Sequence, residues 1–315
     1  MPKLQFNSYE TLDDVLYDVF DDLINRPFDI KATRGTTSEI IGASFQLTNP
    51  LARLSRSEVK SKAFSAIGEL CWYLSACNKL DFIEYYIKKY RKDEEDGIIY
   101  GGYGPRLFNM RNQHNQIENI ISLLKAGPTT RRAVIQLYDA SDIAEKHKEI
   151  PCTCNLQFLI RQGKLHLYVS MRSNDAFKGL PHDVFAFTML QEIIAKTLEV
   201  ELGNYYHSVG SLHLYDDDKA KARTYLNEGF QPTNLNMPAM PAGDPWPTIQ
   251  ALLNFENAVR TGQSVTLDSL EMDQYWLDIA GLIYIYGLRQ QKKYNQVKTL
   301  LPKINPIYKV FVKKD

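Results

Sequence analysis

The amino-acid sequence predicts an α+β fold, and three observations support this class. Segments of alternating apolar and polar residues predict strands, runs of apolar residues at helical spacing predict helices, and the two kinds interleave irregularly. This order differs from the regular strand–helix–strand alternation of α/β proteins. With 315 residues, 44% of them hydrophobic and 23% charged, the chain can bury a sizeable core. Because no repeat or long linker divides it, we expect a single domain over residues 1–315.

Helices are predicted where apolar residues recur at helical spacing. The helix over 183–198 is largely apolar and should be central. The helix over 62–73 is apolar around most of its circumference, yet it contains Glu69. An unpaired buried carboxylate is costly, so this acid needs a specific role. In chain order, the predicted helices cover residues 11–23 (with Ser8 or Thr11 as the cap), 62–73, 115–125, 183–198, 247–261 and 273–294.

Strands are predicted where β-branched and aromatic residues alternate with polar ones. Arg161-Gln162-Gly163 joins two of them as a short hairpin in which glycine supplies the positive φ. Arg131 and Arg132 come directly before another predicted strand. Because neighbouring residues of an extended chain point to opposite faces, the two arginine side chains should point in opposite directions. The proline-rich stretch 231–246 is expected to cross the surface. In chain order, the predicted strands cover residues 41–47, 133–138, 155–160, 164–169 and 204–215.

Charge and hydropathy exclude several classes of protein. The 37 basic and 37 acidic side chains give no net charge, which argues against a protein that holds a nucleic-acid polymer by neutralising phosphates. The N-terminus lacks the apolar segment of a secretory signal, and no apolar stretch is long enough to span a membrane. We therefore expect a cytoplasmic protein with no membrane partner, whose four cysteines are free thiols.

Cys152 and Cys154 form a Cys-x-Cys pair that alone is a weak signal. A metal site would need two further cysteine or histidine ligands at compatible spacing, and the sequence offers none, so no metal is expected. The simplest interpretation of an isolated pair is two small buried residues at the start of a strand. Residues two apart on a strand share a face, so we expect both thiols on the same side.

Several motifs around this pair change that interpretation. Pro151 precedes Cys152, Gln157-Phe158 follows five residues on, and RSNDAFKGLPHD then spans 172–183. GSLHLY at 210–215 comes after these motifs, and Thr130-Arg131-Arg132 comes before them. Together, in this order and spacing, they resemble the thymidylate synthase family over residues 34–215. The resemblance implies a large mixed sheet packed with helices, with one sheet face forming the interface of a homodimer.

The catalytic groups follow from the same resemblance. Cys152 is expected to add to C6 of a pyrimidine nucleotide and thereby activate C5, and nearby arginines should lower its pKa. Cys154 is expected to serve only in packing. Glu69 corresponds to the acid that relays protons around the pyrimidine and the folate. Tyr103 corresponds to a proton-relay tyrosine, with Tyr100 as the alternative.

The resemblance also implies how the phosphate is bound. Planar guanidinium groups suit a phosphate dianion, so four arginines are expected to bind it. The hydroxyl group of Ser173, next to Arg172 in the sequence, is expected to bind it as well. Surface ion pairing could explain one such arginine but not four. In the family the adjacent pair reaches into the partner's site, so two would act across the homodimer interface. The four are Arg34, Arg131, Arg132 and Arg172, of which Arg131 and Arg132 would act across the interface.

Other positions are assigned to the sugar, the base and the cosubstrate. His213 and Tyr215 resemble the pair that holds the sugar 3′-hydroxyl, although a lone strand histidine is more often structural. Gln157 is expected to bind the nucleotide. Asp175 and Gly179, together with the catalytic Glu69, are expected to bind 5,10-methylenetetrahydrofolate.

Asp183 is the informative departure from the family. Thymidylate synthases carry Asn there, which accepts from N3–H of uracil and donates to O4. Cytosine presents the reverse pattern, and a protonated carboxyl group supplies the matching donor and acceptor. Related deoxycytidylate 5-hydroxymethyltransferases carry Asp at this position. Alternatively, Asp183 could only cap the helix that follows it.

The sequence therefore predicts transfer of a one-carbon unit from 5,10-methylenetetrahydrofolate to C5 of deoxycytidylate, or of cytidylate, completed by water. The chain also ends in a charged tail, YKVFVKKD at 308–315, where thymidylate synthases have a short apolar one, and weaker closure would admit water. Two alternatives remain: a thymidylate synthase acting on deoxyuridylate, and an inactive nucleotide- or RNA-binding homologue. The intact Cys152 argues against the inactive homologue.

Overall fold

A seven-stranded mixed sheet forms the centre of the computed structural model, which describes residues 6–57, 59–60, 63–233 and 236–312. Strands β8 and β9 run parallel, as do β1 and β3, and the other neighbouring strands are antiparallel. The sheet confirms the predicted α+β class. The order is β1 (Asn7–Tyr9), β3 (Gly35–Leu47), β9 (Glu201–Tyr215), β8 (Lys164–Asp175), β7 (Thr153–Arg161) and β6 (Val134–Gln136), with β2 (Ile30–Ala32) paired to β3.

The β7–β8 hairpin forms as predicted. Arg161 pairs with Lys164, which leaves a two-residue turn of Gln162 and Gly163 with φ values of 52° and 74°. Two successive positive φ angles characterise the turn whose twist matches that of paired strands. At the other end of the hairpin, the start of β7 lies beside the last part of β8, and several of the predicted site residues lie there.

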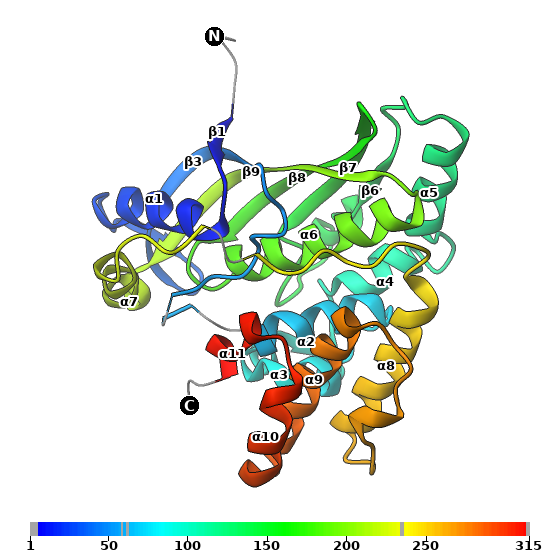
Figure 1. The fold of residues 1–315 in the computed structure, drawn as a ribbon. Coiled ribbons are helices and arrows are strands. Elements are labelled where there is room, and N and C mark those ends of the chain that lie inside the picture. The colour runs from blue at the N-terminus through cyan, green and yellow to red at the C-terminus, as the bar shows by residue number, and fades with distance from the viewer. Residues whose placement is uncertain (1–5, 58, 61–62, 234–235, 313–315) are drawn as a thin grey trace.

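Helix α6 (Leu180–Thr197) packs against β8 and β9 and is the central helix that the sequence predicts (Figure 1). Its cap position is Gly179 and Pro181 lies in its first turn, so the helix begins three residues before Asp183. The interpretation of Asp183 as a helix cap is therefore wrong. Helix α1 (Leu12–Ile24) also packs on the sheet, and Thr11 caps it by accepting from the backbone N–H of Asp14.

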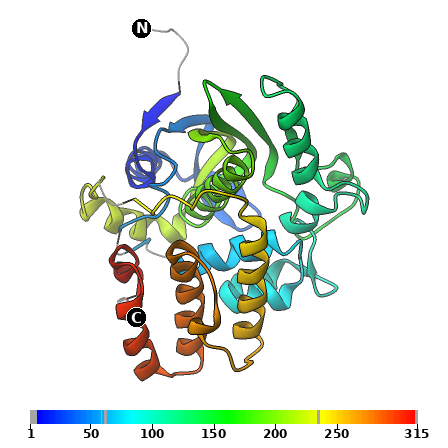
Figure 2. The same cartoon turned by 45° about the vertical axis from the view of Figure 1, so that its right-hand side comes forward.

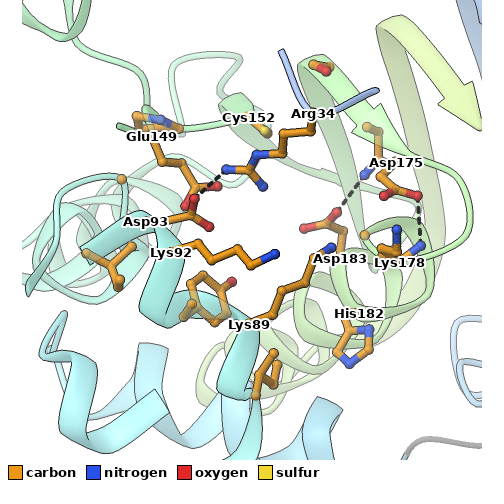
Figure 3. Close-up of a pocket in the computed structure, with 18 of the residues that line it drawn as sticks. Arg34, Lys89, Lys92, Asp93, Glu149, Cys152, Asp175, Lys178, His182 and Asp183 are labelled. Carbon is orange, nitrogen blue, oxygen red and sulfur yellow. Dashed lines mark hydrogen bonds and ion pairs between the residues drawn. The ribbon is translucent and has the colours of Figure 1, made fainter. Parts of the chain in front are cut away.

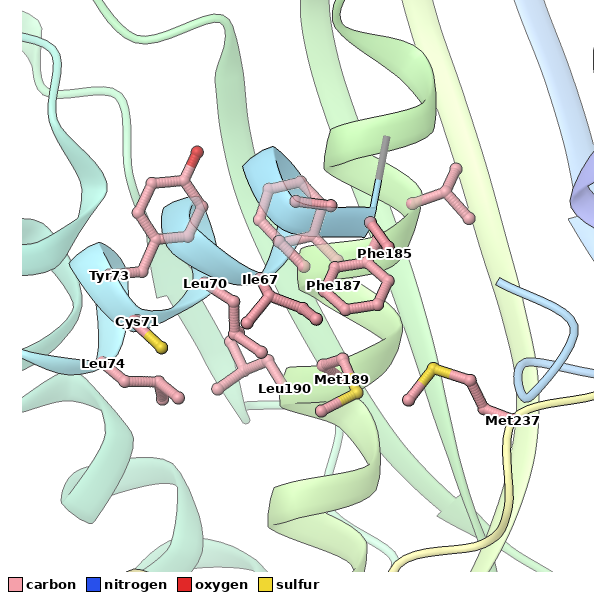
Figure 4. Packing of buried hydrophobic residues seen from close by; sticks show 14 of the residues in the cluster. Ile67, Leu70, Cys71, Tyr73, Leu74, Phe185, Phe187, Met189, Leu190 and Met237 are labelled. Carbon is pink, nitrogen blue, oxygen red and sulfur yellow. The ribbon is translucent and has the colours of Figure 1, made fainter. Parts of the chain in front are cut away.

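A second layer of helices packs beneath α6 (Figures 1 and 2). Helix α2 (Ala63–Leu74) contacts α6, and Ile67 and Leu70 of α2 meet Phe187 and Leu190 of α6 in the buried cluster of Figure 4. This contact joins α2 to the central helix that lies on the sheet. The remaining helices are α3 (Leu80–Tyr86), α4 (Tyr103–Phe108), α5 (Gln116–Ala126), α7 (Asp216–Asn227), α8 (Trp246–Arg260), α9 (Gln274–Gln290), α10 (Tyr294–Leu300) and α11 (Pro306–Val312).

Two expectations about the second half are wrong. The proline-rich stretch does not simply cross the surface, because Met237 and Met240 are buried and their backbone N–H groups donate to Leu51 O and to Glu192 Oε1. The end of the chain is not a solvated charged tail up to residue 312, because α11 buries Tyr308 and Phe311. Lys309 lies in the same helix, between buried apolar residues. Residues 313–315 lie outside the described part.

Short elements complete the wall of the cavity described below. A 3₁₀-helix, η1 (Lys88–Asp93), follows α3, and a small ladder pairs β4 (Glu94–Glu95) with β5 (Ile98–Ile99). Further 3₁₀ turns are η2 (Ala140–Ile143), η3 (Leu267–Ser269) and η4 (Leu301–Lys303). No helix of the described residues is long and apolar enough to cross a membrane.

Candidate active site

A cavity of about 1840 Å³ opens between the sheet and helices α2 and α6. Typical pockets for one small ligand hold roughly 300–1,000 Å³, so this cavity can hold two. Most of the predicted site residues line it, although they come from distant parts of the chain. They are Arg34, Glu69, Tyr103, Cys152, Arg172, Ser173, Asp175, Gly179, Asp183, His213 and Tyr215.

Cys152 lies in the loop just before β7, where Arg172 of β8 fixes it. The Arg172 guanidinium donates to Pro151 O at 2.9 Å and to Ile150 O at 3.0 Å, and its Nη2 lies 3.9 Å from Cys152 Sγ. Burial raises the pKa of the Cys152 thiol to about 12, although Arg172 lowers it. The net direction corrects our expectation of a lowered pKa, because desolvation outweighs one neighbouring cation. The thiol therefore needs a proton acceptor when it reacts.

Cys154 does not share the position of Cys152. The strand begins only at Thr153, and its pairing with β8 is irregular between Thr153 and Asn155. The expected alternation therefore does not hold here, and only Cys152 lines the cavity. Cys154 is half-buried beside it.

Asp183 ends a directed chain of hydrogen bonds. Asn174 Nδ2 donates to Asp183 Oδ2 at 2.7 Å, and Asn174 Oδ1 lies 3.1 Å from His207 Nε2. His207 Nδ1 in turn lies 2.7 Å from the hydroxyl of Tyr205. Burial lowers the pKa of His207 to about 3, so the ring is neutral at pH 7. Since an amide oxygen only accepts, Nε2 carries the proton and Nδ1 accepts from Tyr205.

The protonation of Asp183 follows from this environment. Burial raises the pKa of its carboxyl group well above the usual range, and the charges of Glu69 and Asp175 add to the effect. These effects favour the protonated form of the carboxyl group. Because Oδ2 already accepts from Asn174, the free position for that proton is Oδ1. In this form Asp183 presents an O–H donor and a carbonyl-type acceptor side by side.

Gly179 keeps this arrangement open. A Cβ atom built there would lie 2.9 Å from Asn174 Nδ2 and 3.4 Å from Asp183 Oδ2. A side chain at this position would therefore press on the Asn174–Asp183 hydrogen bond. Asp175 has a local role as well, because its Oδ1 accepts from the backbone N–H groups of Phe177 and Lys178 at 2.9 Å each.

Glu69 and Tyr103 lie on the helical side of the cavity. Glu69 is buried on α2, where Tyr90 donates to its Oε1 and burial raises its pKa. The Tyr103 hydroxyl lies 2.9 Å from Thr153 Oγ1 and accepts from the Thr153 backbone N–H at 3.1 Å. The alternative, Tyr100, stacks on His147 with ring centroids 3.4 Å apart, outside the cavity lining. Position therefore favours Tyr103.

The arginines fall into two groups. Arg34 and Arg172 line the cavity, and Arg34 pairs with Asp93 at 2.7 Å. Arg131 and Arg132 are exposed and lie outside it. Gln157 is also outside the lining, and its Nε2 donates to Arg131 O at 2.9 Å.

The residues that were predicted to bind the sugar line the cavity together with Ser173. Ser173, His213 and Tyr215 line it, with His213 and Tyr215 in edge-to-face contact at 5.2 Å between ring centroids. His213 and Tyr215 are two apart on β9, so they project from the same face.

Sequence reasoning missed several charged groups in the cavity (Figure 3). Lys89 and Lys92 extend into it from η1, and neither has a hydrogen-bond or ion-pair partner among the described residues. Asp93 and Glu149 are acids on the same side. The only sequence signals are a basic run at 88–92 and an acid just before the Pro-Cys motif. In the described part of the chain, no group of three His, Cys, Asp or Glu residues could hold a metal ion.

Comparison with known proteins identifies similar chains. The family model described as thymidylate synthase matches residues 25–245. The deoxyuridylate hydroxymethyltransferase of Bacillus phage SP01 is 32% identical over 205 residues, which is 60% of this chain and 54% of that protein. The thymidylate synthase of Bacillus phage phi3T is 35% identical over 127 residues, 39% of this chain and 45% of that one. This chain thus spans about half the length of both relatives.

A solved structure is similar as well. The thermostable thymidylate synthase A of Bacillus subtilis superposes with a TM-score of 0.58 at 26% identity. The superposition covers 69% of this chain and 84% of that one. The fold is therefore that of the predicted family, with a mixed sheet packed against helices.

Proposed function

The chain belongs to the thymidylate synthase family, and on this premise we propose that it hydroxymethylates a cytidine monophosphate. A one-carbon unit passes from 5,10-methylenetetrahydrofolate to C5 of the base, and water completes the product. Deoxycytidylate is the favoured substrate, and cytidylate is the alternative. The observation that carries the proposal is the carboxyl group of Asp183, which Asn174 orients and whose raised pKa favours the protonated form.

Asp183 suits cytosine because donor and acceptor match on both atoms. Its Oδ1–H donates to N3 of the base, and Oδ2, which already accepts from Asn174, accepts from the 4-amino group as well. Uracil would place its N3–H against the Asp183 hydroxyl hydrogen. A site built to hydrogen-bond one base rejects the mismatched one strongly, because buried polar groups are left unpaired.

Cys152 is the proposed nucleophile. Its Sγ adds to C6, the C5–C6 electron pair moves toward C4, and Asp183 shares its proton with N3 as charge develops there. Burial makes the resting thiol hard to ionise, so the attack depends on a nearby acceptor. The cavity holds Glu69 for proton relay and Tyr103 within the same wall.

The remaining residues are proposed to hold the two substrates. Arg34, Arg172 and Ser173 bind the 5′-phosphate, with Arg131 and Arg132 supplied by the partner of a homodimer. The exposure of Arg131 and Arg132 supports a role outside their own cavity. His213 and Tyr215 hold the sugar, and Gln157 stabilises the segment that carries Arg131.

The cavity suits a second, anionic substrate. Its volume exceeds what one nucleotide needs, and Lys89 and Lys92 bring cations toward the carboxylates that a folate carries (Figure 3). Asp175, Gly179 and Glu69 are proposed to border that substrate. Completion of the reaction by water is supported by the similarity to the SP01 protein, which is named a hydroxymethyltransferase.

A second candidate function has its own support. Both relatives are named for chemistry on a uracil or thymine nucleotide, deoxyuridylate hydroxymethylation and thymidylate synthesis. Action on deoxyuridylate is therefore the alternative. It would require Asp183 to accept from N3–H of uracil either as a carboxylate, which its raised pKa opposes, or with its proton on Oδ2, to which Asn174 donates.

Product identification tests the proposal. The protein is incubated with 5,10-methylenetetrahydrofolate and one of four nucleotides: deoxycytidylate, cytidylate, deoxyuridylate or uridylate. The products are then identified by mass spectrometry. We expect 5-hydroxymethyldeoxycytidylate, and no product with the Cys152→Ala variant. Exclusive conversion of deoxyuridylate would contradict the proposal. A rise in dihydrofolate absorbance would indicate the reductive ending instead.

A further inference from the structure

Glu149 is a carboxyl group at the cavity wall for which the reaction above has no role. It lies three residues before Cys152, in the loop that leads into β7. Its Oε2 is buried and has no hydrogen-bond partner among the described residues. Figure 3 shows the side chain directed from this loop toward the Arg34–Asp93 pair. A buried carboxylate oxygen without a partner, three residues from the proposed nucleophile, calls for a chemical explanation.

The surroundings of Glu149 hold it near the point of ionisation. Burial raises its pKa to about 7, and the charges of Asp93 on η1 and Glu69 on α2 act in the same direction. Arg34, which precedes β3, and Arg172 on β8 act in the opposite direction. A carboxyl group with a pKa close to 7 can both take up and release a proton at neutral pH.

Glu149 lines the same cavity as Cys152 and Asp183, three residues before Cys152 in the loop that leads into β7. Its charge raises the pKa of both groups. On the proposed function, Cys152 attacks C6 and Asp183 binds the N3–C4 edge. C5 lies between these ring atoms, and the transferred carbon projects from C5 into the cavity that Glu149 lines.

The other acids on this side are already engaged. Glu69 accepts from Tyr90, Asp93 pairs with Arg34, and Asp183 accepts from Asn174. Glu149 alone among these four keeps a buried oxygen without a partner in the described structure. Such an oxygen can accept a hydrogen bond from a water molecule held in the cavity.

We propose that Glu149 is the general base that activates the water of the hydroxymethyl ending, an inference that rests on the proposed function. The water oxygen bonds to the methylene carbon on C5 while one water proton passes to Glu149 Oε2. The pair of the C5–methylene double bond moves into the C4–C5 bond, and the C4–N3 π pair moves onto N3, where Asp183 shares its proton. The N3 pair then returns to the C4–N3 bond, the C4–C5 pair forms the C5–C6 double bond, and the bond from C6 to Cys152 Sγ breaks. The departing thiolate takes the proton held by Glu149.

The test compares Glu149→Gln with Glu145→Gln, which removes the same charge from an exposed position in the same loop. Tritium release from C5-labelled deoxycytidylate reports carbon transfer, and mass spectrometry reports the hydroxymethyl product. Because a positioned base contributes roughly 10²–10⁴-fold, we expect the ratio of product to released tritium to fall at least about 100-fold in Glu149→Gln. We expect Glu145→Gln to keep the wild-type ratio and Glu149→Asp to recover part of it.

Two further readouts separate catalysis from a structural role. Added 2-mercaptoethanol should trap the methylene carbon of Glu149→Gln as a thioether, because a thiolate needs no base at that step. The wild-type ratio should decline below about pH 7, the pKa of Glu149, and the Gln variant should show no such decline.

Specific outcomes would overturn the role of Glu149. A Gln variant with the wild-type ratio contradicts it. A Gln variant that folds and binds deoxycytidylate but releases no tritium assigns Glu149 to the earlier attack by Cys152, which also contradicts it. If Glu149→Gln does not fold, an unchanged ratio in Glu149→Asp across the pH range has the same meaning. Absence of tritium release in the wild-type protein would instead refute the proposed function, and this role with it.

Discussion

Side chains in and behind the cavity wall have protonation states that depend on their surroundings. The raised pKa of Asp183 favours its protonated form, and burial keeps the imidazole of His207 neutral, although both would be mostly charged in water at pH 5. Asn174 lies between them and transmits the orientation of one to the other. The proposed base-reading role of Asp183 therefore depends on Asn174 and, behind it, on His207.

Gly179→Ala tests that dependence. The added Cβ would press on Asn174 Nδ2 at 2.9 Å, so we expect kcat/KM for deoxycytidylate to fall about tenfold, which corresponds to about 1.4 kcal/mol of lost transition-state stabilisation. Gly127→Ala is the matched control, because the nearest atom to a Cβ there lies 3.9 Å away. Equal activity of both variants and the wild type would contradict the requirement for glycine at 179.

His207 should make the fold sensitive to acid. Its pKa is about 3 in the folded chain and about 6.5 when unfolded, so between these pH values the unfolded state binds the extra proton. Stability is therefore lost as pH falls from 6.5 toward 3, by up to about 4–5 kcal/mol from this group. Denaturant unfolding from pH 4 to 8 should show a shallower loss for His207→Gln than for the wild type. Parallel curves would refute this.

Among the elements, α6 carries both the proposed base-reading residue and a central part of the packing. Its first turn presents Asp183, and its buried Glu192 pairs with the fully buried Arg53 and accepts from the Met240 backbone at 2.7 Å. Glu192 thus joins the helix to two distant segments. These contacts fix the position of α6 relative to the sheet, and therefore also the position of Asp183.

Arg53→Met should destabilise the fold by about 3–5 kcal/mol, because it leaves the carboxylate of Glu192 buried without its cation. The double variant Arg53→Met/Glu192→Met removes both charges and should recover much of that loss. The free energy of unfolding from denaturant titration provides the measurement. Equal losses in the single and double variants would show that the ion pair is not the cause.

The elements also show what the sequence could predict. The β7–β8 hairpin and α6 have local signatures, namely a Gly turn and an uninterrupted apolar helix, and both form where they were predicted. Strand β8, however, continues to Asp175, beyond the expected end at residue 169. The start of α6 was misplaced because Pro181 reads as a loop residue but fits the first helical turn. Strand alternation failed at Cys154, where an irregular pairing breaks the period of two.

Across the whole molecule, the cavity joins segments that no local pattern connects. The motif residues around Cys152 and Asp183 were predictable because the family likeness spans them. Lys89, Glu149 and Phe311 were not, because they enter the cavity from η1, a loop and α11, whose approach depends on tertiary packing. The single-domain organisation and the homodimer remain predictions.

Mixed dimers test the role of the exposed arginines. One chain carries Cys152→Ala, and the other carries Arg131→Ala and Arg132→Ala. If the arginines act across a twofold interface, each mixed dimer contains one intact site, and random mixing recovers about a quarter of wild-type activity. Each homodimer alone should be nearly inactive. No recovery on mixing would place both arginines in their own subunit's site or outside the reaction.

The central claim is that a neutral carboxyl group at position 183 selects cytosine. The measurement that tests it most directly is the ratio of kcat/KM for deoxycytidylate to that for deoxyuridylate, in the wild type and in Asp183→Asn. We predict that the wild type favours deoxycytidylate by at least about 100-fold and that the Asn variant favours deoxyuridylate, because the amide reverses the match to the base. An Asn variant that keeps the wild-type cytosine preference would contradict the claim.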